Sequence, residues 1–225
     1  MESQPIDRPI KYTGIEPKFT MQYSPNSLIK DPRIINGFLI AGVVTNLAMI
    51  YFLFEVNMGA VKLKNKIKQL SFLTGIFFLL PLIALGVIFT YDKWPTLLLS
   101  LFIINFGMDT GAWAFGKLFG KHKLWPKVSP NKTVEGLLGG MLTSATLGSL
   151  FWDYFIGEVS VGLFFLFSFF GLLSQVGDLF QSKLKRTFEI KDSSNLIPGH
   201  GGIYDRADSL IFLAPFFALA LKYIY

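Results

Sequence analysis

The segment from Ser182 to Asp208 combines residue types that hold phosphate and a divalent metal. Lysine and arginine neutralise phosphate, and Mg²⁺ prefers carboxylate oxygens together with substrate phosphates. Glycine lets backbone N–H groups approach an anion closely. The residues concerned are Lys185, Arg186, Lys191, Asp192, His200, Gly201, Gly202, Asp205, Arg206 and Asp208. We therefore expect phosphoryl or nucleotidyl chemistry here. Two roles stay open for His200: contact with a phosphate or proton donation, and hydrogen bonding within the loop.

Apolar runs surround this segment and must position it. Of the 225 residues, 52% are hydrophobic and 16% are charged, a balance that is rare in soluble domains. Six runs approach the roughly 20 residues that cross a bilayer, near 34–56, 70–91, 95–115, 136–156, 161–180 and 210–225. We predict an all-α fold, a polytopic transmembrane helical bundle of about six spans. A polar N-terminal tail, residues 1–33, would precede a transmembrane domain, residues 34–225.

The basic residues indicate which side of the membrane the site faces. They gather in the loops after the first, third and fifth runs, at 62–68, 117–132 and 183–206. The positive-inside rule makes these loops cytoplasmic and the N-terminus external. The net charge of +6 also favours contact with anionic membrane lipid. Nothing in the basic loops argues for a nucleic-acid partner, and the absence of cysteine excludes disulfides and thiolate metal sites.

Two acids, Asp109 and Asp178, lie within the apolar runs, where a carboxylate costs about 2.5–3.5 kcal/mol to insert. On a helix, Asp178 belongs to a polar row formed by Gly171, Ser174, Gln175, Asp178, Ser182 and Lys185. Asn105 and Asp109 form a similar, shorter row. These rows fit the wall of an aqueous cleft. The alternative is that they only bind helices to one another.

The charged segment resembles the signature of phosphatidate cytidylyltransferases, also called CDP-diacylglycerol synthases. The matching residues are Gly177-Asp178-Leu179, Ser182, Lys185-Arg186, Lys191-Asp192, Pro198-Gly199-His200-Gly201-Gly202 and Asp205-Arg206-Ala207-Asp208. A second block is similar to the other motif of the family: Asp109-Thr110-Gly111-Ala112, Gly116-Lys117, Phe119-Gly120-Lys121 and Ser129-Pro130-Asn131-Lys132-Thr133-Val134-Glu135-Gly136. The resemblance covers about residues 105–225, the expected catalytic portion. Asn131, Val134 and Ala207 depart from the usual residues, which are lysine, tryptophan and a larger apolar residue.

The resemblance implies an enzyme that joins CTP and phosphatidic acid to give CDP-diacylglycerol and pyrophosphate, with Mg²⁺ and room for a second cation. It implies that Asp178 and Asp205 hold the metal, with Asp109 and Asp208 as second candidates. We expect Lys185, Arg186 and Arg206 to bind phosphates during catalysis. Further substrate contacts are expected from Ser182, Lys132, Lys191, His200, Gly201 and Gly202. The expected location is a bacterial inner (cell) membrane, with the active site facing the cytoplasm.

Several alternatives stay open. Glu135 follows a basic loop and begins a run, so it is either a helix N-terminal acid or a site residue. Other CTP-dependent membrane enzymes, CDP-archaeol synthases and polyprenol kinases, are rivals with a different lipid acceptor. A transporter also uses intramembrane acids, but it would predict repeated broken helices, and no internal repeat is visible. The phenylalanine-rich faces fit lipid contact and a homodimer interface equally well.

Overall fold

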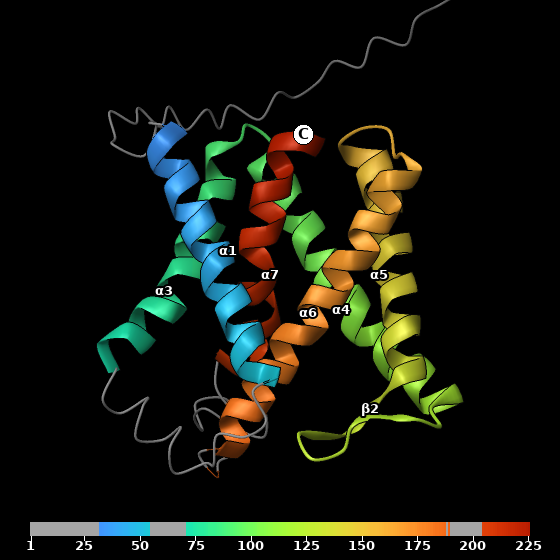
Figure 1. Ribbon diagram of the computed structural model, residues 1–225. Coiled ribbons are helices and arrows are strands. Elements are labelled where there is room, and N and C mark those ends of the chain that lie inside the picture. Colours follow the sequence, from blue (N-terminus) through green and yellow to red (C-terminus); the bar gives the residue numbers. More distant parts are fainter. Residues whose placement is uncertain (1–31, 55–70, 188, 190–203) are drawn as a thin grey trace, which may run out of the picture.

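The computed structural model describes residues 32–54, 71–187, 189 and 204–225, and in them the chain is almost entirely helical (Figure 1). The helices are α1 (Pro32–Phe54), α3 (Ser71–Val87), the short 3₁₀ helix η2 (Ile88–Thr90), α4 (Trp94–Phe119), α5 (Val134–Phe155), α6 (Val161–Thr187) and α7 (Tyr204–Ile224). Two short strands, β1 (Lys123–Trp125) and β2 (Ser129–Thr133), lie between α4 and α5. Each predicted apolar run corresponds to a helix.

The helices form the predicted all-α polytopic bundle. Five of the described helices, α1, α4, α5, α6 and α7, are long and apolar enough to cross a membrane. The described apolar part of α3 with η2, Leu79–Thr90, is shorter than a full span. Successive helices run in opposite directions (Figure 1). The carboxyl ends of α4 and α6 and the amino ends of α5 and α7 therefore lie at the same end of the bundle.

Three helix boundaries differ from the predicted ones, and all three extend the helices toward this end. Helix α4 continues past residue 115 to Phe119, and α6 continues past residue 180 to Thr187. Helix α7 begins at Tyr204, not near residue 210, so Asp205 and Arg206 are in its first turn and not in a loop. These stretches are helical, but their charged and polar residues interrupt the apolar runs from which the boundaries were predicted.

Small residues bring α4 and α5 into close contact. A methyl group at Gly140 would lie 2.7 Å from the backbone oxygen of Met108, and one at Gly136 would lie 2.6 Å from the backbone oxygen of Ala112. Only glycine allows the two backbones to come this near without displacement. This contact fixes the start of α5 against the end of α4.

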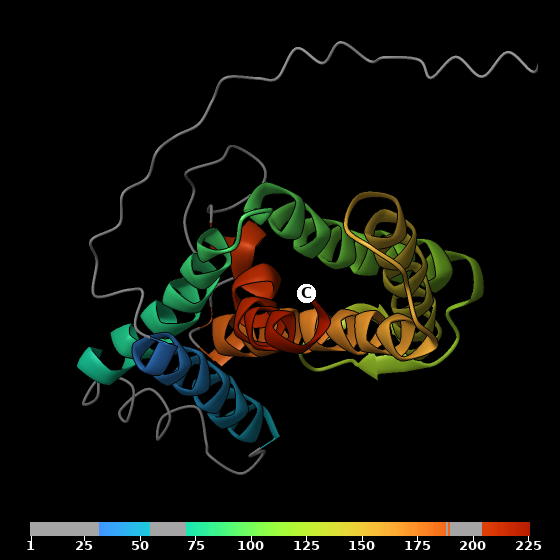
Figure 2. The same cartoon turned by 90° about the horizontal axis from the view of Figure 1, so that it is seen from above.

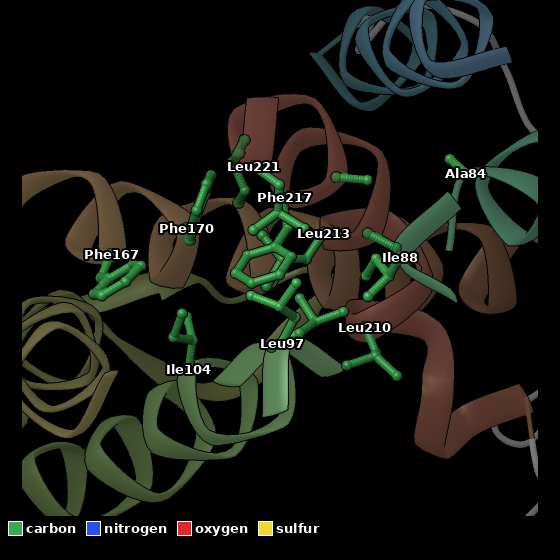
Figure 3. Close-up of a cluster of buried hydrophobic side chains, with 14 of the residues drawn as sticks. Ala84, Ile88, Leu97, Ile104, Phe167, Phe170, Leu210, Leu213, Phe217 and Leu221 are labelled. Carbon is green, nitrogen blue, oxygen red and sulfur yellow. The ribbon is translucent and has the colours of Figure 1, made fainter. Parts of the chain in front are cut away.

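Helix α7 lies between two groups of helices, with α1 and α3 on one side and α4 and α6 on the other (Figure 2). Its buried Leu213, Phe217 and Leu221 belong to the same apolar core as Leu97 of α4 and Phe170 of α6 (Figure 3). Pro215 interrupts the hydrogen-bond pattern of α7. The buried amide of Asn46 in α1 donates to the nearby Phe212 oxygen at 2.6 Å. The first helix is thereby tied to the helix that enters the site.

The strands form an antiparallel hairpin where we predicted only a basic loop. Lys123 pairs with Thr133 and Trp125 with Ser129, and the ladder is irregular between these pairs. The Val128 N–H donates to the Trp125 oxygen at 3.1 Å and closes the turn. The hairpin lies at the end of α4 and α5 where α6 also ends (Figure 1).

Candidate functional site

An ion pair between the hairpin and α6 is the centre of the site. The Lys132 ammonium on β2 donates to the Asp178 carboxylate on α6, although the two residues are 46 positions apart. Their side chains are 22% and 30% exposed. The pair is therefore partly shielded from solvent and keeps more of its Coulomb energy than a surface pair does.

The polar row predicted on α6 is buried at its deep end and partly exposed toward the end of the helix. Gly171, Ser174 and Gln175 are buried, and Asp178, Ser182 and Lys185 are partly buried. The Ser182 hydroxyl donates to the second oxygen of Asp178 at 3.4 Å. One level deeper, the Ser174 hydroxyl donates to the amide oxygen of Asn105 at 2.8 Å, so the rows of α4 and α6 meet. The contact between Ser174 and Asn105 joins α6 to α4, whereas Asp178 contacts Lys132 of the hairpin.

A second lysine–acid contact joins α6 to α7. Lys185 Nζ lies 3.9 Å from the buried carboxylate of Asp208, which also accepts from the Ser209 N–H at 2.7 Å. The charge of Asp178 acts on both Asp109 and Asp208, and so does the charge of Lys132. We call Asp109, Lys132, Asp178, Lys185 and Asp208 the charged cluster. It brings together three of the four predicted metal ligands and two of the predicted phosphate-binding cations.

The donor set of the charged cluster fits a hard divalent cation. Its three acids come from three helices, α4, α6 and α7. Among the described side chains, no three histidine or acidic groups converge as a complete metal shell. Mg²⁺ needs only one or two carboxylates when substrate phosphates complete its coordination. The residues present therefore fit Mg²⁺ bound together with a phosphate-bearing substrate.

A cavity of about 230 Å³ adjoins the ion pair. Residues of α4, the hairpin, α5 and α6 line it, among them Asp109, Trp113, Asn131, Lys132 and Gln175. Apolar and glycine residues make up much of the remaining wall. Such a lining, mostly apolar with a few convergent polar groups, is typical of small-molecule sites. The cavity lies directly beside Lys132, so a ligand there would be adjacent to the charged cluster.

Glu135 holds the loop after α4 to the start of α5. Its carboxylate accepts from the backbone N–H groups of Lys121 (3.1 Å) and His122 (3.2 Å) and contacts His122 Nδ1 at 2.6 Å. The neighbouring Thr133 caps α5 by accepting from the Gly136 N–H at 3.1 Å. Glu135 lies in the first turn of α5, which fits a helix N-terminal acid, and its contacts tie that turn to the loop after α4. It anchors the hairpin that carries Lys132.

The remaining predicted residues are distributed as follows. Arg186 is exposed in the last turn of α6. Asp205 and Arg206 are in the first turn of α7, and their side chains lie outside the described part of the structure. Lys191, His200, Gly201 and Gly202 also lie outside the described residues. We predicted Gln175 as part of the polar row but assigned it no function. Its position about one helical turn from Asp178 was the signal that could have identified it as a residue of the site.

The fold and the charged cluster define a polytopic membrane protein with acids and lysines gathered at one end of its helical bundle. The sequence pattern of the Cytidylyltransferase family matches residues 30–224, and the chain belongs to this family. The match reaches much further toward the N-terminus than the signature region at about 105–225.

Similar proteins include the phosphatidate cytidylyltransferase of Staphylococcus aureus strain COL, 41% identical over 162 residues. Proteins of the same name from Staphylococcus epidermidis and Staphylococcus saprophyticus are 38% and 37% identical over 159 residues. Each alignment covers 68% of this chain and 61% of the relative. The chain thus spans about three fifths of the length of these relatives.

Proposed function

We propose that this protein joins CTP and phosphatidic acid to give CDP-diacylglycerol and pyrophosphate. The observation that carries the proposal is the charged cluster at the membrane-helix ends of a chain that belongs to the cytidylyltransferase family. The name of its staphylococcal relatives supports the same reaction. CDP-archaeol synthases and polyprenol kinases are the rivals, because they also use CTP at a membrane.

In the proposed reaction, a phosphate oxygen of phosphatidic acid attacks the α-phosphorus of CTP. A new oxygen–phosphorus bond forms, and the bond between the α-phosphorus and the oxygen bridging to the β-phosphate breaks. Pyrophosphate leaves with the electron pair of that bond. Little covalent help is required, so positioning and charge neutralisation by the protein supply the rate enhancement.

The charged cluster divides this work with three further predicted residues, Arg186, Asp205 and Arg206. Lys132 and Lys185 lie beside carboxylates in the described structure and supply positive charge to the phosphates when substrate binds. Asp178 and Asp205 would hold Mg²⁺, with Asp208 beside them, and Arg186 and Arg206 would contact the departing phosphates. When bound, the cation supplies charge that stabilises the pentacoordinate transition state.

We place the reaction at the cytoplasmic face of a bacterial inner (cell) membrane. Lysines gather at the end of the bundle that carries the site, as the positive-inside rule requires for a cytoplasmic face. The bacterial origin of the relatives supports the location. CTP would reach the site from water, while the acyl chains of phosphatidic acid stay in the bilayer.

The test is conversion of labelled CTP by the purified protein with phosphatidic acid and Mg²⁺. The expected product is labelled CDP-diacylglycerol, formed only when Mg²⁺ is present. Asp178→Asn should abolish turnover and leave membrane insertion intact, whereas Asp153→Asn, an exposed acid at the opposite end of α5, should not. Product formation with a polyprenol or archaeal lipid, but not with phosphatidic acid, would refute the acceptor and favour a rival.

A homodimer is a further part of the proposal. Large apolar side chains, including Leu138, Leu142 and Leu150 of α5, are exposed, and lipid could cover them as well as a second copy could. The chain contains no cysteine, so Leu142→Cys provides a single thiol for cross-linking in membranes. A cross-linked pair at low protein-to-lipid ratio supports the dimer, and only monomer at any ratio argues against it on this face.

A further inference from the structure

A line of exposed apolar side chains runs along α4 toward the end of the bundle that carries the charged cluster. Leu99, Phe106 and Trp113 are 49%, 54% and 67% exposed, although all three are large and apolar. Each lies seven residues after the one before, so they share a face of the helix with a drift of about 20° at each step. The line is about 21 Å long, and half of a bilayer core is about 15 Å thick. It therefore offers an acyl chain a continuous apolar surface through one leaflet.

This apolar line ends at an exposed lysine. Lys117 lies one turn beyond Trp113, in the last turn of α4, and its Nζ is 5.2 Å from the centre of the indole ring. A cation–π contact of this kind positions the ammonium without using its hydrogen-bond donors. Among the side chains that the structure describes, no carboxylate forms an ion pair with Lys117. The ammonium is therefore available to an anion at the end of the line.

The same tryptophan borders the cavity beside the charged cluster. Trp113 belongs to the cavity wall, and so does Asp109 one turn deeper on α4. A ring enclosed by the cavity would not be 67% exposed, so Trp113 lies at the opening. Lys132 is also part of the wall and contacts Asp178. A phosphate that enters past Trp113 would thus move from a lysine at the opening to a lysine of the charged cluster.

The charge around the opening suits an anionic headgroup. From residue 110 to residue 134 the chain has five lysines and no acid, and four of the lysines are exposed. Basic residues at a membrane surface attract anionic lipid. The phosphomonoester of phosphatidic acid carries up to two negative charges, whereas a zwitterionic headgroup would bring a cation that the lysines repel. A nucleotide would leave the apolar line without a partner, so the combination favours an anionic lipid.

We propose that this face of α4 is the route by which phosphatidic acid enters the site, with an acyl chain along Leu99, Phe106 and Trp113 and the phosphate bound by Lys117. The inference rests on the proposed function, because it names the path of the lipid substrate into the same site. Lys117 binds the lipid before the reaction and does not contact the reacting atoms. It should therefore set the KM for phosphatidic acid and not kcat.

The first experiment measures lipid contact without catalysis. The protein is reconstituted in phosphatidylcholine vesicles that contain a small fraction of phosphatidic acid with brominated acyl chains, which quench tryptophan fluorescence on contact. Brominated phosphatidylcholine at the same fraction is the reference. We expect brominated phosphatidic acid to quench more strongly than the reference. The excess should disappear in Trp113→Phe, which removes one of the four tryptophans, and in Lys117→Gln.

The second experiment measures kinetics as a function of the mole fraction of phosphatidic acid. Lys117→Gln should raise the KM for phosphatidic acid about fivefold, the effect of losing one lysine at an anionic membrane surface. The kcat and the KM for CTP should stay unchanged, and Lys117→Arg should restore the KM for phosphatidic acid because it keeps the charge.

Two exposed lysines provide matched controls. Lys127→Gln removes a charge from the hairpin at the same end of the bundle, at a residue that is not part of the cavity wall. Lys93→Gln removes a lysine beside the exposed Trp94 at the opposite end of α4. Neither control should change the KM for phosphatidic acid or the excess quenching.

Three outcomes would overturn the inference. Equal quenching by the two brominated lipids would mean that Trp113 contacts bulk lipid without selection, and quenching of Trp113 by neither would mean that protein, such as a second copy, covers this face. An equal rise in KM for Lys117→Gln and Lys127→Gln would indicate a general effect of surface charge. Failure of the proposed function is a different result: no product forms from CTP, while brominated phosphatidic acid still quenches more strongly.

Discussion

Replacing Lys132 by methionine should strengthen metal binding while slowing turnover. Lys132 contacts Asp178, and its charge also acts on Asp109 and Asp208. In the ligand-free protein this ammonium neutralises the same carboxylates that a divalent cation would use. Methionine keeps most of the length of the side chain and removes the charge. The acids are then left without their nearest cation and should attract Mg²⁺ more strongly.

The magnitude follows from the exposure of the pair. Unit charges 4 Å apart interact by about 1 kcal/mol in water and about 4 kcal/mol at an effective dielectric constant of about 20. The side chains are 22% and 30% exposed, so an intermediate value of about 2 kcal/mol is appropriate. Since 1.4 kcal/mol is tenfold in an equilibrium constant, the Mg²⁺ dissociation constant should fall roughly thirtyfold. Loss of a cation that binds the phosphates should lower kcat about 100-fold.

Calorimetric titration of Mg²⁺ into the nucleotide-free protein measures the first effect, and labelled-CTP turnover measures the second. Lys127→Met is the control, because Lys127 is an exposed lysine in the turn of the same hairpin. It should change neither quantity. Mg²⁺ affinity that is unchanged or weaker in Lys132→Met would refute the reasoning, since it would mean that Lys132 does not compete for the carboxylates.

Other regions of the fold give further expectations. Gly140→Ala should destabilise the protein by about 1–3 kcal/mol, measured by thermal unfolding in detergent, because its methyl group would lie 2.7 Å from a backbone oxygen of α4. Gly37→Ala, with open space around it, should be neutral, and equal effects would contradict the packing argument. Glu135→Gln should lower kcat/KM several-fold by loosening the hairpin, and Glu135→Leu should lower it more; normal kinetics in both would remove its anchoring role. Asn46→Leu should cost about 1–2 kcal/mol, because it removes a buried hydrogen bond between α1 and α7, and an unchanged melting temperature would refute this.

Much of α6 could be predicted from the sequence because its signal is local. Residues 171, 174, 175, 178, 182 and 185 share a face at the helical period, and the structure places all of them on one continuous helix. The apolar runs located the helices for the same reason. The ends of the helices were harder to predict, because the last turns of α4 and α6 contain charged residues of the kind that is common in loops.

The contacts that assemble the site could not be predicted, because they join distant positions. Lys132 and Asp178 are 46 residues apart, and Asn46 and Phe212 are 166 apart. The hairpin that carries Lys132 has strands of three and five residues, one of them containing Pro130, and so shows no clear alternation.

The antiparallel order of the helices has a kinetic consequence. Because α4, α5, α6 and α7 present their site-forming ends on one side, the lipid substrate and the lipid product would belong to a single leaflet (Figure 1). Neither headgroup would have to cross the hydrocarbon layer. Phosphatidic acid would then diffuse in the two dimensions of the bilayer, and CTP would diffuse in the three dimensions of the water. Under the proposed function, the rate at a fixed CTP concentration should follow the mole fraction of phosphatidic acid in the bilayer, and dilution with inert lipid should slow the reaction even when the total amount of phosphatidic acid is constant.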